Sequence, residues 1–424
     1  MSVHRSDRDS GRASSLVIWS IVIFLVAILV RCAIILRAGP SVIGGEPLNI
    51  AKSLAADWRF AEAFGAGSGP TAHTMPLYPW LLSFVIRMFD GSPFLNQACQ
   101  IFCSAAAALG FALLPFVAVA AQLNVSAGIV GGLAGALLPI NFWAQSSGVF
   151  ESSFTAAAII ALLLLVAPVF SDGRFDVYGG MKVGLAAGIA CLFNPSVVPV
   201  LAVWVLVCLF RYPEQRWAVI RFSAAGAVFT VLLLTPWALR NRQVFGEWIW
   251  TRQNLGLELQ VSHNDFATAD LEYNVRQPWF HLVHPFGGKE EFARLRQLGE
   301  PAYNRAKMQE AFAWVAEHKR QFTTLTLDRF WLFWVPNMRR PLQSALEILL
   351  TLGGLAGLIQ AMRKRLPCAD MFAAIFIAYP VIYYFVQSSP RYRYPVEPLL
   401  FLLAAYFASG LWTRIVGRLA GVRS

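Results

Sequence analysis

The chain has 424 residues, of which 57% are hydrophobic and only 14% are charged, and its formal net charge is +11. This composition excludes an ordinary soluble enzyme and is typical of a polytopic membrane protein, in which apolar runs of about 20 residues cross the bilayer. The excess Lys and Arg is then expected in cytoplasmic loops and beside anionic lipid headgroups, so it does not indicate a nucleic-acid partner. The six cysteines show no metal-ligand spacing in a polar loop, which argues against a disulfide scaffold or a Cys-ligated zinc site.

About ten apolar segments, taken in chain order, are expected to cross the membrane. They cover residues 16–36, 95–121, 126–144, 149–170, 178–194, 195–211, 217–236, 342–362, 369–387 and 395–415. The first is too long for the core of a signal peptide and is interpreted as a retained anchor. The short loops rich in Arg and Lys fall on the same side as both chain ends, and the positive-inside rule makes that side cytoplasmic. We therefore predict an all-α, multi-pass protein of the inner (plasma) membrane.

This topology divides the chain into four regions. They are a cytoplasmic tail (1–15), an N-terminal transmembrane catalytic module (16–236) with an outer loop at 37–95, an outer-face loop domain (237–340) and a C-terminal transmembrane module (341–424). The loop domain is long enough to hold short helices of its own, one of them in "PAYNRAKMQEAFAWVAEH". In the first outer loop, "MPLYPWLLSFVIRMF" is too short to span and is expected to lie in the outer membrane surface or as a buried loop helix.

The stretch "GGEPLNIAKSL", which begins at Gly44, places two glycines and a carboxylate soon after the first apolar segment. Glycine allows a positive φ and a close backbone approach, and Pro47 suits the first turn of a following helix. Glu46 would then lie at a helix N-terminus, where the helix dipole favours the ionised carboxylate. A helix cap at a loop is one interpretation, and a functional carboxylate at the membrane surface is the other.

Six parts of the chain, in order, carry a resemblance to a known family. They are "GGEPLNIAKSLAADWRF" with "GPTAHTMPLYPWLLSFVIRMFDG", "SSGVFESSFTAAAIIALLLL", "CLFNPSVVPVLAVWVL", "TPWALRNRQVFGEWIWTRQNLGLELQVSHND", "HKRQFTTLTLDRFWLFW" and "SSPRYRYPVEPLLFLLAAY". Together they cover most of the chain. The sequence resembles the GT-C membrane glycosyltransferases, the superfamily of protein O-mannosyltransferases and of bacterial enzymes that add aminoarabinose to lipid A.

The resemblance implies a GT-C-like fold and an enzyme whose site opens on the outer face of the membrane. It implies a polyprenyl-phosphate sugar as donor, and a carboxylate in the first external loop that acts as the base or anchors the site. That carboxylate falls on Glu46. Many relatives have Asp-Glu at this turn, whereas Gly45 precedes Glu46 here. Whether Glu46 alone suffices is therefore left open, as is a divalent cation, and no metal ligand is assigned.

Three further residues near the outer ends of the first segments are candidates for substrate binding. Glu151, in "GVFESSF", is expected at the interface facing protein, because a lone carboxylate inside the bilayer costs about 2.5–3.5 kcal/mol. It could orient a substrate beside Glu46 or cap its own helix. His73, in "PTAHTMP", could bind substrate or belong to no site, and Tyr78 of the same loop is taken with it as a candidate.

Three arginines on the predicted outer face are the candidate partners of a phosphate. Arg391 and Arg393, in "PRYRYP", stand two residues apart in a short hairpin and could bind phosphate through bidentate hydrogen bonds. Ordinary lipid headgroups are the alternative ligands of this pair. Arg240, in "PWALRN", leaves the seventh apolar segment on the same face and is the third candidate.

The sequence thus predicts a membrane glycosyltransferase with Glu46 as its catalytic residue. Transfer from a lipid-linked sugar passes through an oxocarbenium-like transition state, so the site needs a base for the acceptor hydroxyl and positive charge for the leaving phosphate. The acceptor could be a lipid, a glycan or a protein. A transporter or flippase of lipid-linked sugars is one alternative, although no internal repeat is visible. A catalytically inactive GT-C-like protein is the other, because Gly45 replaces a common acidic residue.

Overall fold

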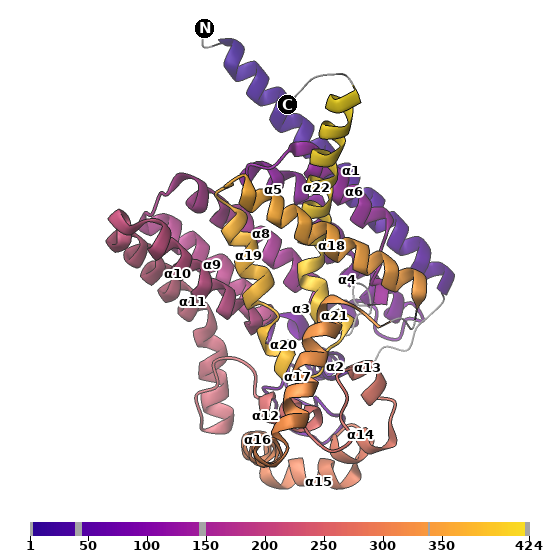
Figure 1. Cartoon of the computed structure of the whole chain (residues 1–424). Coiled ribbons are helices and arrows are strands. Elements are labelled where there is room, and N and C mark those ends of the chain that lie inside the picture. The colour runs from indigo at the N-terminus through magenta and orange to yellow at the C-terminus, as the bar shows by residue number, and fades with distance from the viewer. Residues whose placement is uncertain (1–2, 39–44, 144–149, 338–339, 420–424) are drawn as a thin grey trace.

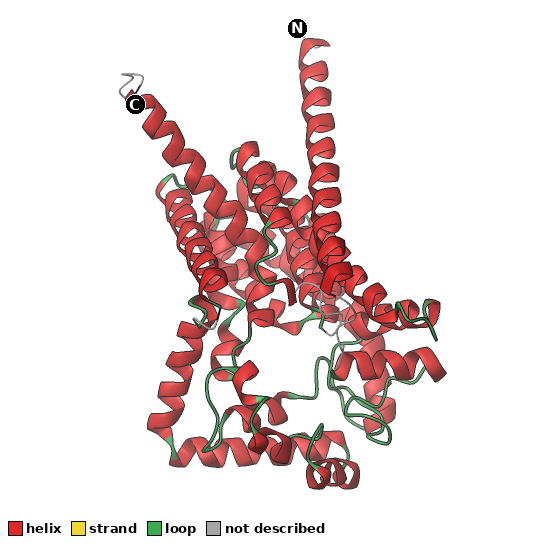
Figure 2. Cartoon of the chain, turned by 90° about the vertical axis from the view of Figure 1, so that its right-hand side faces the viewer, coloured by secondary structure: helices red, strands yellow, loops and turns green. Residues whose placement is uncertain are grey.

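The computed structural model describes residues 3–38, 45–143, 150–337 and 340–419. Within these ranges the chain is helical, apart from connecting loops and two isolated β-bridges (Figure 2). Long helices form a bundle, and the shorter helices between residues 255 and 317 gather at one end of it (Figure 1). The start of the first helix, α1 (Val3–Ala38), and the end of the last, α22 (Glu397–Leu419), lie at the opposite end.

Six helical segments of the described chain are long and apolar enough to cross a membrane. They are Ser14–Ala38 in α1, Leu95–Ala120 in α4 (Leu95–Ala112) and α5 (Leu114–Ala120), Ser152–Asp172 (α8), Pro213–Phe245 with α11 (Arg216–Phe245), Pro341–Arg363 (α18) and Pro390–Val416 with α21 (Pro390–Arg393) and α22. Six of the predicted crossings fall on these segments.

The other four predicted crossings fall on shorter apolar helices. These are α6 (Val125–Leu137), α9 (Val177–Phe193), Pro195–Arg211 with α10 (Val198–Arg211), and Ala369–Phe385 with α19 (Ala369–Ala378) and α20 (Val381–Phe385). Helix α6 ends seven residues before the predicted segment does, and the last residue of that prediction lies outside the described ranges. Helices α19 and α20 are separated at Pro380, where proline cannot continue the backbone hydrogen bonding of a helix.

Small residues allow neighbouring helices of the bundle to approach closely. Helices α9 and α11 pack along one another, and a Cβ added to Gly184 would lie 2.2 Å from the carbonyl oxygen of Gly226. Any side chain at Gly184 would therefore push the two helices apart, and a glycine at such a crossing is a common device in membrane proteins. Thr230 of α11 donates a hydrogen bond of 3.0 Å to the Gly184 carbonyl across the same contact.

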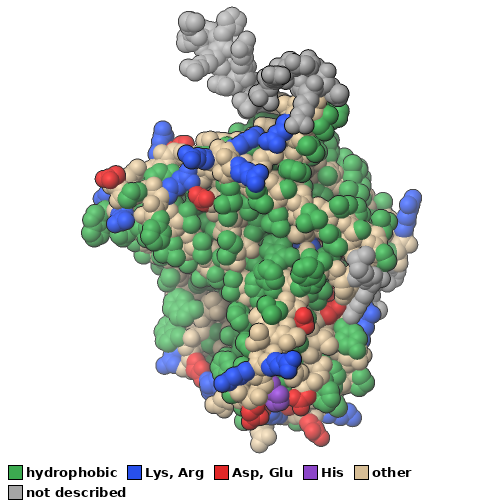
Figure 3. Space-filling model, in the orientation of Figure 1, with side chains coloured by type: hydrophobic (Ala, Val, Ile, Leu, Met, Phe, Trp, Pro, Cys, Tyr) green, Lys and Arg blue, Asp and Glu red, His purple; other side chains and the backbone are tan. Residues whose placement is uncertain are grey.

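The surface of the bundle is apolar, as expected for contact with lipid. Figure 3 shows hydrophobic side chains over the middle of one face, with Lys and Arg toward its two ends. In α11, only 17% of the most apolar stretch is buried inside the protein. This distribution fits a bilayer that surrounds the bundle, with the charged ends of the molecule outside it.

Two loop regions build the end of the bundle that lies away from α22. The first holds α2 (Glu46–Asp57) and α3 (Leu77–Met88), and α3 exposes Trp80, Phe84 and Met88 while it buries its other face. The second, here called the loop domain, comprises residues 246–337. It contains α12 (Leu255–Ser262), α13 (Leu271–Asn274), α14 (Pro278–Val283), α15 (Lys289–Leu298), α16 (Glu300–Glu317) and α17 (Lys319–Trp334).

The helix predicted in "PAYNRAKMQEAFAWVAEH" is confirmed as α16. The boundary predicted after residue 236 falls inside a helix, because α11 continues through Pro236 to Phe245. A shared apolar core joins the loop domain to α2: Ile50 and Leu54 pack with Leu257, Leu295 and Tyr303. The loop domain therefore fixes the position of the helix that begins at Glu46.

Candidate functional site

A small polar cavity lies where the first loop and the loop domain meet the end of the bundle. Its volume is about 50 Å³. It is lined by Glu46, Pro47, His73, Thr74, Phe150, Glu151, Ser152, Asn194, Arg252, Asn254, Glu258, Tyr383, Arg391 and Tyr392, and it is called the Glu46 cavity below. Four of the candidates taken from the sequence, Glu46, His73, Glu151 and Arg391, are thus brought together from distant parts of the chain.

Glu46 is placed in the cavity by the turn that starts α2. Gly45 has φ 136° and ψ 165°, a conformation that glycine adopts and other residues avoid. Pro47 occupies the first turn of α2, so the helix start predicted from the sequence is confirmed. The Gly45 carbonyl accepts the Asn49 amide at 3.1 Å, and the Asn49 side chain donates to the Ala63 carbonyl at 3.0 Å, which anchors the turn to the first loop.

The pKa of the Glu46 carboxyl is raised from 4.5 to about 7, chiefly because burial removes the carboxylate from water. A hydrogen bond from its own backbone amide and the charge of Arg391 act in the opposite direction and are outweighed. The negative charges of Glu258 and Glu151 raise the pKa further. The expectation that the helix N-terminus keeps Glu46 ionised is therefore wrong in its net effect. A pKa near neutrality suits a general base at physiological pH.

His73 faces Glu46 as a neutral imidazole. Its Nε2 atom lies 3.9 Å from Oε1 of Glu46, beyond hydrogen-bond distance, and its ring meets Phe64 edge-on at 4.9 Å. Burial, together with the charges of His284, Arg252 and Arg391, lowers the pKa of His73 to about 3. The pair is consequently not an ion pair at neutral pH. His73 is suited to donate or accept one hydrogen bond toward a ligand beside Glu46.

Two guanidinium groups supply positive charge to the cavity. Arg252 donates to Glu151 at 2.9 Å, and Arg391 lies over the Phe150 ring at 3.6 Å from its centroid. Arg391 also donates to the Tyr392 hydroxyl at 2.7 Å. Burial raises the pKa of the third carboxyl, that of Glu258, while the charges of Arg391 and Arg252 lower it. Positive and negative groups therefore alternate around the cavity wall.

Several polar atoms of the cavity residues have no hydrogen-bond partner in the described protein. They are Nδ1 of His73, Oγ1 of Thr74 and the Nε atoms of Arg252 and Arg391. Buried polar atoms in native proteins almost always have a partner, so a cluster of unpartnered donors and acceptors indicates a place for a polar ligand or water. Donors dominate the set, which favours an anionic or hydroxyl-bearing ligand.

Three residues predicted to bind substrate lie away from the Glu46 cavity. Arg240 donates to the carbonyls of Thr71 (2.7 Å) and Phe60 (2.6 Å), so it holds the first loop against α11. Tyr78 is buried, with its hydroxyl 3.3 Å from the Cys103 sulfur. Arg393 is buried between Glu347 (3.5 Å) and Glu397 (3.8 Å).

The two arginines of "PRYRYP" consequently do not face one cavity. Helix α21 turns between them and directs Arg391 and Arg393 to different surroundings. Both arginines lie at the start of the last candidate span, Pro390–Val416. The expectation that Arg391 and Arg393 together bind one phosphate is therefore wrong, because the helical turn separates their side chains.

Sequence reasoning did not single out Arg252, Glu258, Asn194 or Tyr383. Asn194 donates to the Tyr383 hydroxyl at 3.2 Å and approaches Glu151 at 3.5 Å, which links α9 and α20 beneath the cavity. Arg252 lies inside the fourth resembling stretch, but no local spacing marks it as functional. Only the folded arrangement reveals these four residues.

The described residues include no group of three or more His, Cys, Asp or Glu side chains arranged to hold a metal ion. The three carboxylates of the Glu46 cavity are instead interleaved with arginines, which compete with a cation for them. A divalent cation therefore gains no assigned ligand, and the chemistry below is derived from side chains alone.

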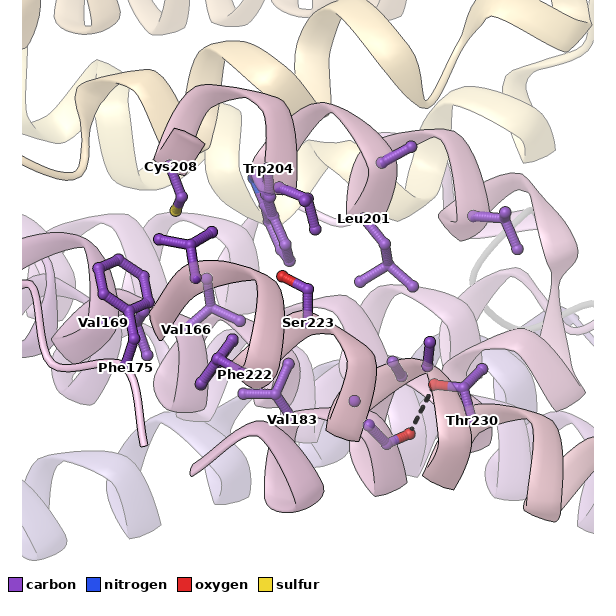
Figure 4. A pocket seen from close by; sticks show the side chains of 18 of the residues that line it. Val166, Val169, Phe175, Val183, Leu201, Trp204, Cys208, Phe222, Ser223 and Thr230 are labelled. Atoms are coloured by element: carbon purple, nitrogen blue, oxygen red, sulfur yellow. Dashed lines mark hydrogen bonds between the residues drawn. The ribbon is translucent and has the colours of Figure 1, made fainter. Parts of the chain in front are cut away.

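A larger cavity, of about 300 Å³, lies within the bundle among α8, α9, α10 and α11. Figure 4 shows that its walls are mostly apolar, with Val166, Val183, Leu201 and Phe222 among the labelled side chains, beside the hydroxyls of Ser223 and Thr230. Its lining contains no acid–base group apart from the thiol of Cys208. Size alone would favour this cavity, but it lacks the groups that the chemistry of transfer requires.

Comparison with solved structures shows the fold. The archaeal oligosaccharyltransferase AglB from Archaeoglobus fulgidus, in complex with an inhibitory peptide and a dolichol-phosphate, superposes with a TM-score of 0.54 and 13% identity over 96% of this chain and 52% of that one. The apo form of the Archaeoglobus fulgidus oligosaccharyltransferase gives a TM-score of 0.56 and 12% identity, again over 96% and 52%. The present chain thus spans about half the length of these transferases. ArnT from Cupriavidus metallidurans, bound to undecaprenyl phosphate, matches at 12% identity over 94% of this chain and 78% of that one. Its TM-score of 0.41 is too low to establish a shared fold.

No family model matches the sequence, and no curated protein matches it. The similarity to AglB extends over almost the whole of this chain, and both bundle and loop domain take part in it. The predicted all-α, GT-C-like membrane fold is therefore confirmed.

Proposed function

We propose that the protein is a membrane glycosyltransferase that moves a sugar from a polyprenyl-phosphate donor to a hydroxyl acceptor on the outer face of the inner membrane. The observation that carries this proposal is the Glu46 cavity, in which a carboxyl with a pKa of about 7 lies among arginines that have unpartnered nitrogen atoms. The fold shared with an oligosaccharyltransferase that binds dolichol-phosphate supports it.

Glu46 acts as the general base in this proposal. Its ionised carboxylate takes the proton of the acceptor hydroxyl, the acceptor oxygen forms a bond to the anomeric carbon, and the bond from that carbon to the donor phosphate breaks. The leaving group departs as a polyprenyl phosphate that carries the negative charge. Attack opposite to the leaving group inverts the anomeric centre. A positioned carboxylate base contributes about 10²–10⁴-fold to such a reaction.

Arg391 and Arg252 stabilise the leaving phosphate. Both line the cavity, both keep an Nε donor without a partner, and guanidinium groups bind phosphate oxygens through two parallel hydrogen bonds. Arg391 is the stronger candidate because no carboxylate is bonded to it, whereas Arg252 is bonded to Glu151 at 2.9 Å. Positive charge fixed in a site with little water stabilises developing negative charge more than it would in bulk solvent.

The placement of the helix ends supports a site on the outer face. The Glu46 cavity lies at the end of the bundle away from the start of α1 and the end of α22 (Figure 1). With those ends cytoplasmic by the positive-inside rule, the cavity faces the periplasm or the outside. The acceptor there could be a lipid, a glycan or a protein.

No observation favours the transporter alternative. Among the buried charged residues of the candidate spans, Arg393 forms ion pairs with Glu347 and Glu397, and Arg31 donates to the carbonyls of Ala27, Gly135 and Ala136. Such paired groups stabilise a packed bundle and do not line a path for a polar headgroup. A catalytically inactive protein would not require a carboxyl whose pKa is about 7 beside arginine nitrogen atoms that have no hydrogen-bond partner.

Purified protein in proteoliposomes tests the proposal directly. A radiolabelled polyprenyl-phosphate sugar is supplied with membrane extract as acceptor, and sugar transfer and lipid translocation are measured in parallel. We expect transfer that Glu46→Gln slows by at least about a hundredfold, and envelope glycans or lipids that lose a sugar in a strain without the protein. Translocation without transfer would refute the glycosyltransferase and support the flippase.

A further inference from the structure

A buried carboxylate in the loop domain reaches across to the first loop. Glu300 is the first residue of α16, and its side chain accepts hydrogen bonds from the Thr71 hydroxyl and, at 2.6 Å, from the Ala72 amide. Glu300 does not line the Glu46 cavity. It joins two segments that are 228 positions apart in the sequence.

The segment that Glu300 holds carries or contacts two groups of the Glu46 cavity. The Thr71 hydroxyl also accepts the amide of His73 at 2.9 Å, which fixes the backbone from which His73 reaches Glu46. The Ala72 carbonyl accepts the amide of Gln253 at 2.8 Å, and Gln253 follows Arg252 directly. One carboxylate therefore sets the relative position of the imidazole and a guanidinium of the cavity.

We propose that Glu300 is a positioning residue of the transferase, which holds His73 and Arg252 in register through Thr71 and Ala72. This inference rests on the function proposed above. It is not a catalytic role, because Glu300 acts only through the backbone of the first loop and of residues 252–253.

The charge state of Glu300 decides whether it can make both contacts. Arg240 of α11 is the charged group that faces Glu300 from across the first loop. Helix α12 packs on α16 and carries Glu258, which interacts with Arg252 and Arg391. Helix α15 also packs on α16 and carries Glu291, which is bonded to Lys307. Helix α17 follows the far end of α16. Burial raises the pKa of Glu300 to about 7, against the effect of its hydrogen bonds and of Arg240. An ionised Glu300 accepts from Thr71 and Ala72 together, whereas a protonated one has a donor hydroxyl in place of one acceptor.

Positioning and folding should consequently respond to pH in opposite directions. The two-acceptor form predominates above pH 7, so positioning is complete there and is lost as the pH falls through about 7. The stability that Glu300 contributes runs the other way, because a carboxyl whose pKa is raised by folding contributes less as the pH rises from 4.5 to about 7. A structural role and a positioning role can therefore be separated in one variant.

Glu300→Gln is the test, measured as kcat/KM for the lipid-linked donor across the pH range. The amide offers one acceptor and thus imitates the protonated carboxyl. We expect kcat/KM to be lower than in the parent by about tenfold at about pH 8.5, a modest fraction of what a 1 Å misplacement can cost. The ratio should close toward one by about pH 5.5, where the parent is itself protonated. Melting temperature at alkaline pH should be equal to or above that of the parent.

Glu291→Gln is the matched control in the same pair of helices. Glu291 binds Lys307 at 2.8 Å and accepts a hydrogen bond from Tyr303 at 2.6 Å, both within the loop domain, so its loss should lower the melting temperature. Its activity ratio to the parent, corrected for folded protein, should stay constant with pH. Thr71→Val, which removes one donor to Glu300, should reproduce the alkaline defect and add little to Glu300→Gln.

The positioning role is overturned if the ratio of kcat/KM in Glu300→Gln to that in the parent equals one at every pH, or if it is lowered by the same factor at every pH. The two proposals fail separately. If Glu46→Gln retains the parent rate, the function assigned to the Glu46 cavity is wrong; if Glu46→Gln is inactive and Glu300→Gln is normal, only the role of Glu300 is wrong.

Discussion

The ionisation of Glu46 should be visible in the pH dependence of sugar transfer. Its pKa is about 7, and a general base must be ionised to act. The active fraction is then about one half at pH 7, about a tenth at pH 6 and about a hundredth at pH 5. An exposed glutamate with the ordinary pKa of 4.5 would be almost fully ionised over most of this range. The logarithm of kcat/KM should therefore fall with a slope of about one below pH 7.

The assay follows transfer from one lipid-linked donor in proteoliposomes between about pH 5 and about pH 8. It is run in the parent and in the Glu300→Gln background, because Glu300 also has a pKa of about 7 and adds its own titration. Glu46→Gln should cost at least about a hundredfold at the alkaline end, and its residual rate should lack the acid limb. A midpoint near 4.5 in both backgrounds would refute the argument that burial tunes this base.

The same burial predicts a gain in stability from the inactivating substitution. A carboxyl whose pKa rises from 4.5 to about 7 on folding contributes stability at low pH that is lost as the pH rises through this window. The difference corresponds to about 3 kcal/mol above pH 7, an upper bound because water screens a side chain that is 18% exposed. Glu46→Gln should therefore melt at a higher temperature than the parent at pH 8 and at nearly the same temperature at pH 5.

The remaining predictions concern the two arginines and the topology. Arg391→Ala should raise the KM for the donor and move the acid limb of the pH profile to higher pH, because the charge of Arg391 lowers the pKa of Glu46. Arg391→Lys should restore the position of the acid limb more than the KM, since the lysine ammonium cannot make the bidentate hydrogen bonds of a guanidinium. Unchanged donor binding in Arg391→Ala would leave the arginine without a role in the site. Arg393→Ala should instead cost about 3–5 kcal/mol, because it leaves Glu347 and Glu397 as unpaired buried carboxylates, and the expected signs are poor expression and a lowered melting temperature. A membrane-impermeant thiol reagent applied from outside should label a cysteine introduced at exposed Lys289 of the loop domain, but not one introduced at exposed Gln215 between α10 and α11. The reverse labelling pattern would show that the topology is inverted.

The helices could be predicted because each depends on a local property of the chain. Every apolar segment expected to cross the membrane contains a helix in the described residues, and the glycine–proline turn before α2 determined its start. The end of α11 was misplaced because Pro236 usually interrupts a helix, yet this helix continues for nine residues more. Beyond the proline, Trp237, Ala238 and Asn241 are buried against the first loop and residues 249–251, and this packing outweighs the local preference.

The candidate site could be predicted only in part, because its properties arise from contacts between distant segments. Glu46 and Arg391 were proposed from local motifs and a family resemblance, and the fold brings both to the Glu46 cavity, whereas Arg252 and Glu258 lie in a stretch whose spacing carries no signal. The charge state of Glu46 was predicted from the helix dipole, a local effect, whereas burial by the loop domain decides it. A sequence contains the groups that titrate, and the fold determines how much water reaches them.

In the proposed reaction, the charges around the Glu46 cavity act on both the donor phosphate and the base. Arg252 is bonded to Glu151, and Glu258 faces both Arg252 and Arg391, so an arriving phosphate competes with carboxylates for the same guanidiniums. Burial raises the pKa of Glu258, and the negative charge of a bound phosphate would raise it further. The same effect acts on Glu46, whose pKa in the donor complex should exceed that of the free enzyme. In the proposed reaction the charge of Arg391, which lowers the pKa of Glu46, offsets this effect, so that Glu46 can take the proton of the acceptor hydroxyl as the bond to the phosphate breaks. Under this proposal Arg391 serves both the base and the leaving group, so Arg391→Ala should change the acid limb and the KM for the donor together.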